Sequence, residues 1–217
     1  MAEEYLRHAI ELTPAFALGW CMRGFILGAL RQTEATSECG RQARVLDADS
    51  AVVNYLVGHH LILSQNYAEA ESLLRRSCEL DANFQPSHMQ LGRCLLAQGK
   101  TGEGLRKLEI CARDTHDEYP YALGYLGYAY GQTGRWPEAE KILLKLKQMA
   151  PRQYTPAFAM ALVNMGMDEK DQAMEYLSRA HSAGEASIAT LHLDPNFTPL
   201  RGDPRFQELI RRIGMPV

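Results

Sequence analysis

Three short stretches of the sequence carry residue types that could perform chemistry, and the first is a possible phosphate-binding loop. Gly99, Lys100 and Thr101 match the last three positions of the Gly-x-x-x-x-Gly-Lys-Thr/Ser motif, whose glycine amides cradle phosphates between a strand and a helix. The first glycine of that motif would stand at position 94, which is Cys94. The match is therefore half a motif, and its meaning depends on the elements around it.

The other two stretches could bind a metal ion. His59 and His60 are adjacent, but neighbouring residues point about 100° apart around a helix and do not share a ligand. We therefore expect one of them on a groove and the other against a neighbouring helix. The loop "DTHDE" offers Asp114, His116 and Asp117, although such a cluster is more often solvated. No hydrolase, zinc-protease or dinucleotide motif occurs, so we predict no metal, no cofactor and no catalytic site.

Composition narrows the class of protein. The chain has 217 residues, 46% of them hydrophobic and 23% charged, which is typical of a soluble globular protein. A net charge of −3 lacks the excess of positive charge that is typical of nucleic-acid binding. No run of apolar residues is long enough to span a membrane. The N-terminus is acidic and unlike a signal peptide. Five scattered cysteines without a Cys-x-x-Cys pair predict reduced thiols in a cytoplasmic protein: Cys21, Cys39, Cys78, Cys94 and Cys111.

Three series of small residues recur along the chain with a common period. One contains Gly24, Gly58, Gly92, Gly127 and Ala161, which are separated by 34, 34, 35 and 34 residues. The others, at the same spacings, contain Ala9, Ala43, Ser77, Cys111, Leu146 and Ala180, and Ala2, Thr36, Ala70, Gly104, Ala139 and Ala173. This coincidence indicates an internal repeat whose unit holds two amphipathic helices joined by a polar turn.

The glycines of the first series need a physical reason, because glycine inside a helix costs about 1 kcal/mol relative to alanine. Four of them in register predict a close approach between helices that a larger side chain would block. Larger apolar residues flank them at fixed offsets, among them Val57, Leu91 and Leu126 one residue earlier. One helix pair cannot bury such faces alone, so neighbouring pairs are expected to stack.

The repeat resembles the tetratricopeptide repeat (TPR), with its 34-residue period and small residues at fixed positions. The stretches "NYAEAESLLRRSCELDAN" and "GRWPEAEKILLKLKQMAP" are similar to the second helix and exit turn of that family. The resemblance implies an all-α fold, a right-handed superhelical solenoid of antiparallel helix pairs. It aligns Gly99-Lys100-Thr101 with Gln65-Asn66-Tyr67 and with Gly134-Arg135-Trp136, so we interpret the triplet as an inter-helix turn and not as a nucleotide site.

The expected organisation is one solenoid domain. Residues 1–13 would be a lone second helix, and residues 15–181 would hold about five helix pairs at 17–50, 51–84, 85–119, 120–153 and 154–181. The first full repeat is degenerate, since Arg23 and Gly40 stand where large apolar residues belong. Because the chain opens in mid-repeat, we favour a segment of a longer protein over a natural lone cap. We expect Leu6 and Ile10 to be uncovered, which makes the N-terminal helix weakly protected or a surface for self-association.

Residues 182–217 are expected to form a C-terminal cap. Asp194-Pro195 and Asp203-Pro204 are helix start signals, and an apolar face from Phe206 to Ile213 ends at Gly214. The stretch "LDPNFTPLRGDPRFQELIRRIGMP" also resembles the end of repeat regions in large bacterial signalling proteins. In those, the repeats accompany winged-helix, class III cyclase or Ser/Thr kinase domains.

The TPR resemblance implies that the first helix of each pair lines a concave groove. The residues expected there are Cys21, Phe25, Tyr55, His59, Met89, Arg93, Tyr121, Tyr128, Phe158 and Leu162, some of which could instead pack between repeats. The positions of the carboxylate clamp that binds cytosolic chaperones hold Cys21, Phe25, Pro86 and Gln90, so a co-chaperone role is not expected.

A run of tyrosines indicates where a partner would bind. Tyr121, Tyr125 and Tyr128 recur at helical spacing, and a buried tyrosine hydroxyl needs a hydrogen-bond partner, so three in a row suggest a half-wet face. The alternative is that they fill gaps between repeats. We expect an extended or helical peptide, with an acidic group, across Met89, Arg93, Tyr121 and Tyr128. The sequence thus favours a non-catalytic protein–protein interaction module, with a regulatory portion of a larger bacterial signalling protein as the alternative.

Overall fold

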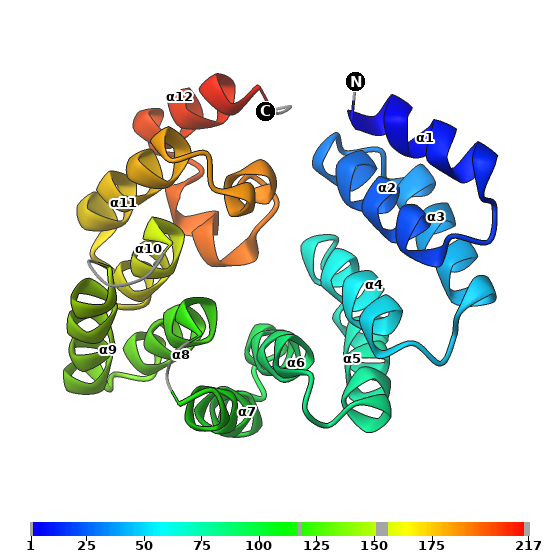
Figure 1. The fold of residues 1–217 in the computed structure, drawn as a ribbon. Coiled ribbons are helices and arrows are strands. Elements are labelled where there is room, and N and C mark those ends of the chain that lie inside the picture. Colours follow the sequence, from blue (N-terminus) through cyan, green and yellow to red (C-terminus); the bar gives the residue numbers. More distant parts are fainter. Residues whose placement is uncertain (1, 117–118, 151–155, 215–217) are drawn as a thin grey trace. The chain divides into compact units, whose positions relative to one another are not determined.

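The computed structural model describes residues 2–116, 119–150 and 156–214, and within these ranges every regular element is a helix. After a first helix, α1 (Ala2–Leu12), five helix pairs follow one another along the chain (Figure 1). They are α2 (Ala17–Ala29) with α3 (Thr33–Leu46), α4 (Ala51–Leu63) with α5 (Tyr67–Leu80), α6 (Gln85–Ala97) with α7 (Thr101–Asp114), α8 (Pro120–Gln132) with α9 (Trp136–Met149), and α10 (Ala157–Gly166) with α11 (Lys170–Ser182). The predicted all-α fold of antiparallel helix pairs is confirmed. Among the described helices, none is both long and apolar enough to cross a membrane.

The chain divides into two compact units, which we describe separately. Unit 1 runs to Cys94 and holds α1 to α5 and most of α6, and unit 2 runs from Leu95 and holds the later helices. In unit 1, α2 packs against α1, α3 and α4, and in unit 2, α8 packs against α7, α9 and α10. The division into repeats proposed from the sequence, and the single domain, stay predictions.

The turns inside the pairs share one backbone geometry. Residues with positive φ stand at Arg31, Gln65, Gly99, Gly134 and Asp168, at the spacings of the sequence repeat. At the third of these turns, the N–H of Gly99 donates to the carbonyl of Leu96 and the N–H of Lys100 to that of Leu95, both at 2.9 Å. This pattern is a Schellman motif, which ends a helix with a left-handed residue. The Gly-Lys-Thr triplet therefore closes α6 and opens α7, as expected.

The repeating glycines lie where helices meet. A Cβ placed on Gly58 would come within 2.8 Å of Leu74 Cγ, and one on Gly127 within 2.6 Å of Val163 Cγ2. At Gly24 the nearest atom would be the Cβ of Cys39, at 3.2 Å. The predicted close approach of helices at these positions is confirmed.

The closest helix contact in unit 2 involves glycines outside that series. A Cβ on Gly131 would lie 2.3 Å from the carbonyl carbon of Gly166, and one on Gly166 would lie 2.5 Å from the carbonyl oxygen of Tyr128. A Cβ on Gly124 would lie 2.9 Å from Ala159 Cα. The backbones of α8 and α10 thus touch along their length, and no side-chain movement could relieve an added methyl group.

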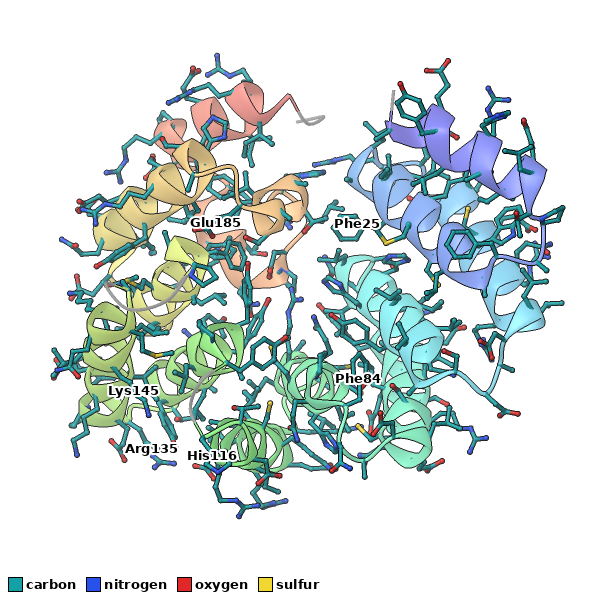
Figure 2. All side chains as sticks on the ribbon, in the orientation of Figure 1. Phe25, Phe84, His116, Arg135, Lys145 and Glu185 are labelled. Atoms are coloured by element: carbon teal, nitrogen blue, oxygen red, sulfur yellow. The ribbon has the colours of Figure 1, made fainter. Side chains whose placement is uncertain are left out.

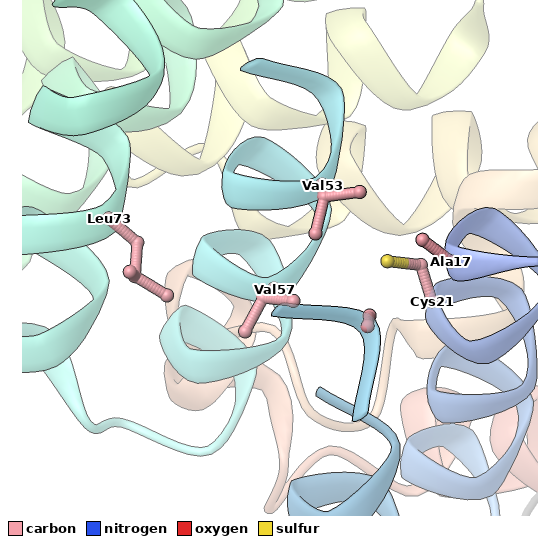
Figure 3. Close-up of a cluster of buried hydrophobic side chains, with 6 residues drawn as sticks. Ala17, Cys21, Val53, Val57 and Leu73 are labelled. Atoms are coloured by element: carbon pink, nitrogen blue, oxygen red, sulfur yellow. The ribbon is translucent and has the colours of Figure 1, made fainter. Parts of the chain in front are cut away.

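One buried cluster of unit 1 consists mostly of small and β-branched side chains. Ala17 and Cys21 of α2 meet Val53 and Val57 of α4, with Leu73 of α5 beside them (Figure 3). Ala43 of α3 completes the cluster, and Trp20, Leu56 and Leu61 pack against it. The degenerate position Gly40 has a purpose here, because a Cβ on it would lie 3.2 Å from Val57 Cγ1.

Helix α1 is attached to α2 more firmly than the sequence suggested. Arg23, which replaces an apolar residue, places Nη2 2.9 Å from the Oε1 of Glu3 on α1. Ile10 is buried and Leu6 is partly buried, so the expectation that both lack cover is wrong for Ile10. The reason is that α1 turns these two residues toward α2 and leaves the opposite side, with Tyr5 and Leu12, exposed.

The C-terminal residues form two short 3₁₀ helices, η1 (Ala186–Thr190) and η2 (Pro195–Leu200), followed by α12 (Pro204–Ile213). The carboxylates of Asp194 and Asp203 accept the N–H groups of Asn196 and Arg205 at 3.0 and 2.8 Å, so both Asp-Pro pairs act as helix starts. A buried face covers α11, formed by Phe206, Leu209 and Ile210. Gly214, with φ of 77°, ends the helix.

We expect Gly131→Ala to destabilise the protein by about 1–3 kcal/mol, because the added methyl group must push α8 and α10 apart. Gly102→Ala is the matched control, since its Cβ would meet no atom closer than Arg106 Nη1 at 3.7 Å. That change should stabilise α7 by up to about 1 kcal/mol through helix propensity. Urea unfolding of both variants measures the difference, and equal effects would refute the close contact.

Candidate functional site

The residues expected to line a groove fall in both units. Unit 1 holds Phe25, Tyr55, His59, Met89 and Arg93, and unit 2 holds Tyr121, Tyr125, Tyr128 and Phe158. Each group is described within its own unit.

In unit 1, four rings form a continuous row, which we call the ring cluster: Phe25 of α2, Tyr55 and His59 of α4, and Phe84 just before α6 (Figure 2 labels Phe25 and Phe84). The centroid of His59 lies 6.2 Å from that of Phe25 and 6.5 Å from that of Tyr55. Tyr55 meets Phe84 edge to face at 5.3 Å. All four side chains are half-buried, so each keeps part of its surface exposed.

Sequence reasoning missed Phe84, although a signal for it exists. It occupies the position before the first helix of a repeat, where the chain carries Phe16, Ser50, Phe84 and Tyr119 at the repeat spacing. Three of these four residues are aromatic. The position could have been proposed as part of a binding face from that series alone.

Buried polar side chains of α6 lie next to the ring cluster. Arg93 and Gln90 are buried, and Arg93 Nη1 donates to Gln90 Oε1 at 3.4 Å. Burial raises the pKa of Tyr55, against the opposing effects of the Arg93 charge and of a hydrogen bond with Gln90. Gln90 was considered in the sequence only as a departure from the chaperone clamp. In the structure, Gln90 accepts a hydrogen bond from Arg93 and contributes to the shift in the pKa of Tyr55.

His59 is uncharged at neutral pH. Burial holds its pKa well below the usual range, and repulsion from Arg93 and His60 lowers it further. A neutral imidazole has one nitrogen that accepts and one that donates a hydrogen bond. The ring cluster therefore combines aromatic faces with a neutral hydrogen-bonding group next to a fixed positive charge.

The second histidine points the other way. His60 is buried against α2, where a Cβ on Gly24 would lie 3.3 Å from its Cε1, and its ring lies 5.9 Å from that of Phe25. Neither of its ring nitrogens has a hydrogen-bond partner among the described residues. This agrees with the expectation of one histidine against a neighbouring helix. Burial lowers the pKa of His60 to about 4.

In unit 2, the expected residues differ in their exposure. Tyr121 is half-buried, with its ring 6.4 Å from those of Tyr119 and Phe158. Tyr128 is also half-buried, whereas Tyr125 is buried. Phe158 is only 3% exposed, because Phe197 of η2 covers it at 5.2 Å between centroids.

A buried carboxylate fixes the C-terminal segment to this face. Glu185, labelled in Figure 2, accepts the N–H of Ala157 at 2.7 Å and that of Phe158 at 3.2 Å. These are the first two N–H groups of α10, and its N-cap residue, Pro156, makes no side-chain cap. Glu185 therefore acts as the missing cap from a distant part of the sequence. No short-range pattern could have predicted this contact.

The remaining residues that could do chemistry, the cysteines and the possible metal ligands, do not come together in a site. All five cysteines are free thiols, and burial raises the pKa of Cys21 to about 12, which keeps that sulfur protonated. Across the described part of the chain, no three His, Cys, Asp or Glu side chains gather as a metal site would require. The "DTHDE" stretch lies partly outside the described residues, since these end at His116 and resume at Tyr119.

Comparisons with known proteins identify the fold. No family model and no curated protein sequence matches the chain. Among solved structures, it is similar to PilW, a widely conserved type IV pilus biogenesis factor, with a TM-score of 0.62 and 20% identity over 87% of each chain. It is also similar to YrrB, a TPR protein with an unusual peptide-binding site, with a TM-score of 0.52 and 17% identity over 88% of this chain and 97% of that one. PilF of Pseudomonas aeruginosa gives 0.57 and 18% over 86% and 85%. The fold is therefore that of TPR proteins.

Acid should destabilise the protein through His60. Its pKa in the folded state lies below the value of about 6.5 in an unfolded chain. The folding stability linked to the neutral imidazole is therefore fully present above pH 6.5 and is lost as the pH falls toward 4. The loss reaches about 3 kcal/mol. We expect His60→Leu to be neutral or stabilising at pH 7, because two unsatisfied nitrogens are removed, and to reduce the acid sensitivity. Urea unfolding at pH 7 and pH 4.5 measures both effects. His8→Gln, at an exposed position, is the control and should retain the full pH dependence.

We expect Glu185→Ala to destabilise unit 2 by about 2 kcal/mol or more, because two buried N–H groups lose their acceptor. The amides of Ala157 and Phe158 should exchange faster in that variant. Glu169→Ala is the matched control, since Glu169 stands at the N-cap of α11 without a side-chain cap. If both changes cost the same in urea unfolding, the capping role of Glu185 is excluded.

Proposed function

We propose that this chain is a non-catalytic interaction module that binds a peptide or protein segment, with the ring cluster of unit 1 as its principal contact surface. The observation that carries the proposal is the row of four half-buried rings on α2, on α4 and just before α6. TPR-type neighbours support the general role, and YrrB is described as having a peptide-binding site. That binding takes place in a groove lined by the first helices is our proposal.

The chemistry of the ring cluster suits a protein segment. Aromatic side chains supply large contact areas at little cost in conformational entropy, and they are enriched where binding energy concentrates. The four rings come from three parts of the chain: α2, α4 and the linker before α6. Packing between these parts fixes the positions of the rings before a partner arrives. Preorganised contacts of this kind reduce the entropy lost on binding.

The polar groups beneath the rings favour a partner with an acidic group. Arg93 places a positive charge near Tyr55 and His59, close enough to alter the pKa of both. A carboxylate near these rings would meet a favourable potential, and a cationic group would be repelled. Met89, buried on the same helix, contributes by holding α6 in place.

We extend the proposal in unit 2 to Tyr121 and Tyr128, whose side chains keep exposed surface. Tyr125 and Phe158 would support these two from beneath, since both are buried. The C-terminal segment covers Phe158, so a partner reaching this unit would contact the tyrosines and not that ring.

A narrower role is the regulation of a larger bacterial signalling protein in the cytoplasm. It is favoured by one observation, the resemblance of the tail with its two Asp-Pro starts to segments of such proteins. The parent gene discriminates the two roles: a cyclase, kinase or winged-helix domain encoded upstream of the repeats would favour regulation.

Peptides selected from a random display library against the full chain provide the test. We expect Tyr55→Ala to weaken the binding of a selected peptide about 30-fold, because truncation of a central aromatic contact costs about 2 kcal/mol. Tyr128→Ala should weaken it less, and Arg93→Gln should remove any preference for acidic residues. Isothermal calorimetry measures these affinities.

Trp136→Ala is the control, since this large exposed ring belongs to a second helix, at the start of α9, and not to the ring cluster. Its loss should leave the affinity unchanged. Should correctly folded Tyr55→Ala bind as wild type while Trp136→Ala does not, the proposed surface is wrong.

A further inference from the structure

The two adjacent histidines of α4 differ in what surrounds their ring nitrogens. Both nitrogens of His60 are buried without a hydrogen-bond partner among the described residues. The side chain of His59 is half-buried, and its nitrogens are not sealed from solvent in this way. Within the described part of the chain, no hydrogen bond occupies them either. His59 therefore keeps one donor and one acceptor for a molecule that reaches the ring cluster.

Packing holds His59 in place within the ring cluster. Its ring lies 6.2 Å from that of Phe25 and 6.5 Å from that of Tyr55, and the planes of His59 and Tyr55 are inclined by only 25°. On the side of α6, Arg93 donates to Gln90 at 3.4 Å and is close enough to repel a proton from His59. A group that approaches His59 thus meets aromatic surface, a hydrogen-bonding imidazole and a fixed positive charge.

The surroundings of His59 disfavour its charged form. Burial of the ring opposes protonation most, and Arg93 of α6 and His60 of α4 oppose it further. No carboxylate among the described residues contributes in the other direction. The titratable groups on α2, α3 and α5 that the structure pairs or keeps neutral are Arg23 with Glu3, Arg41 with Glu38, Arg44 with Glu69, Arg75 with Glu71, Arg76 with Asp49 and Glu79, and the buried thiols of Cys21 and Cys39.

We propose that His59 receives an acidic side chain of the bound segment and takes up a proton from solvent as the complex forms. This inference rests on the function proposed for the ring cluster, and it names the chemical group that the cluster recognises. A carboxylate beside the ring supplies the negative charge that the free site lacks, and an opposite charge within about 4–6 Å favours the protonated imidazole. The imidazolium then donates a charge-assisted hydrogen bond to the carboxylate, next to the guanidinium of Arg93.

The affinity should therefore depend on pH in one direction. In the free chain, burial together with Arg93 and His60 holds the pKa of His59 well below its usual range. A bound carboxylate raises that pKa, so the complex binds more protons than the free chain and the affinity grows as the pH falls. We expect the affinity for an acidic peptide to rise about tenfold from pH 7.5 to pH 5.5. The rise should end near about pH 4.5, where the carboxyl group of the peptide is itself protonated.

Calorimetry on the full chain tests the proposal. A peptide is selected from a random display library for binding that depends on Tyr55, and it is synthesised with its acidic residue and with the matching amide, Asn or Gln. At pH 6 the acidic peptide should bind with uptake of up to about one proton, seen as a difference in binding enthalpy between phosphate and imidazole buffers. The amide peptide should bind without proton uptake, and its affinity should change less than about twofold with pH.

Two variants assign the proton to one residue. His59→Gln keeps a hydrogen-bonding side chain that does not titrate, so it should abolish both the proton uptake and the pH dependence. His8→Gln, at an exposed position of α1, is the matched control and should retain both. Circular dichroism checks that each chain is folded at every pH, and if His59→Gln folds poorly, the two peptides give the same comparison on the unchanged chain.

Three results would overturn the proposal. They are binding of the acidic peptide without proton uptake, a pH dependence that survives in folded His59→Gln, and selected peptides that depend on Tyr55 but carry no acidic residue. Each of these leaves the ring cluster as the binding surface. If no selected peptide depends on Tyr55, the proposed surface itself is wrong, and the role of His59 is refuted with it.

Discussion

The close approach of helix backbones at small residues is the constraint on which the rest of this structure depends. Gly58 and Gly127 sit where any Cβ would meet a neighbouring side chain, and Gly131 meets the backbone of α10 directly. Such contacts fix the separation and the rotation of each helix relative to the next. Because the same residue types recur at the same spacing, the same packing recurs, and the exposed side of each first helix is set with it.

The ring cluster follows from this geometry. Tyr55 and His59 are one helical turn apart on α4, and close packing of α4 on α2 brings Phe25 beside His59. The linker into α6 then adds Phe84, and α6 adds Gln90 and Arg93 beneath. A face assembled from several helices in this way needs no loop rearrangement to be formed. That is the property expected of a scaffold that recognises another protein.

The sequence predicted the features that recur with the repeat and missed single contacts that do not recur. The period predicted the helix pairs, the turn at Gly99 and the close contact at Gly58, because each depends on residue types repeated in register. It did not predict that Glu185 caps α10 or that Phe197 covers Phe158, since these partners lie outside the repeat and only folding brings them together. The supporting role of Gln90 was equally hidden, because a buried hydrogen bond leaves no pattern in one sequence.

Amide chemical-shift mapping by NMR would test the central claim, that the ring cluster is the binding surface, most directly. A peptide selected on the full chain would be titrated into isotopically labelled protein. The account predicts that the largest shift changes occur in α2, α4 and residues 84–93, with smaller changes near Tyr121 and Tyr128. Changes confined to α3, α5 and α9, with none around Tyr55 and His59, would contradict it.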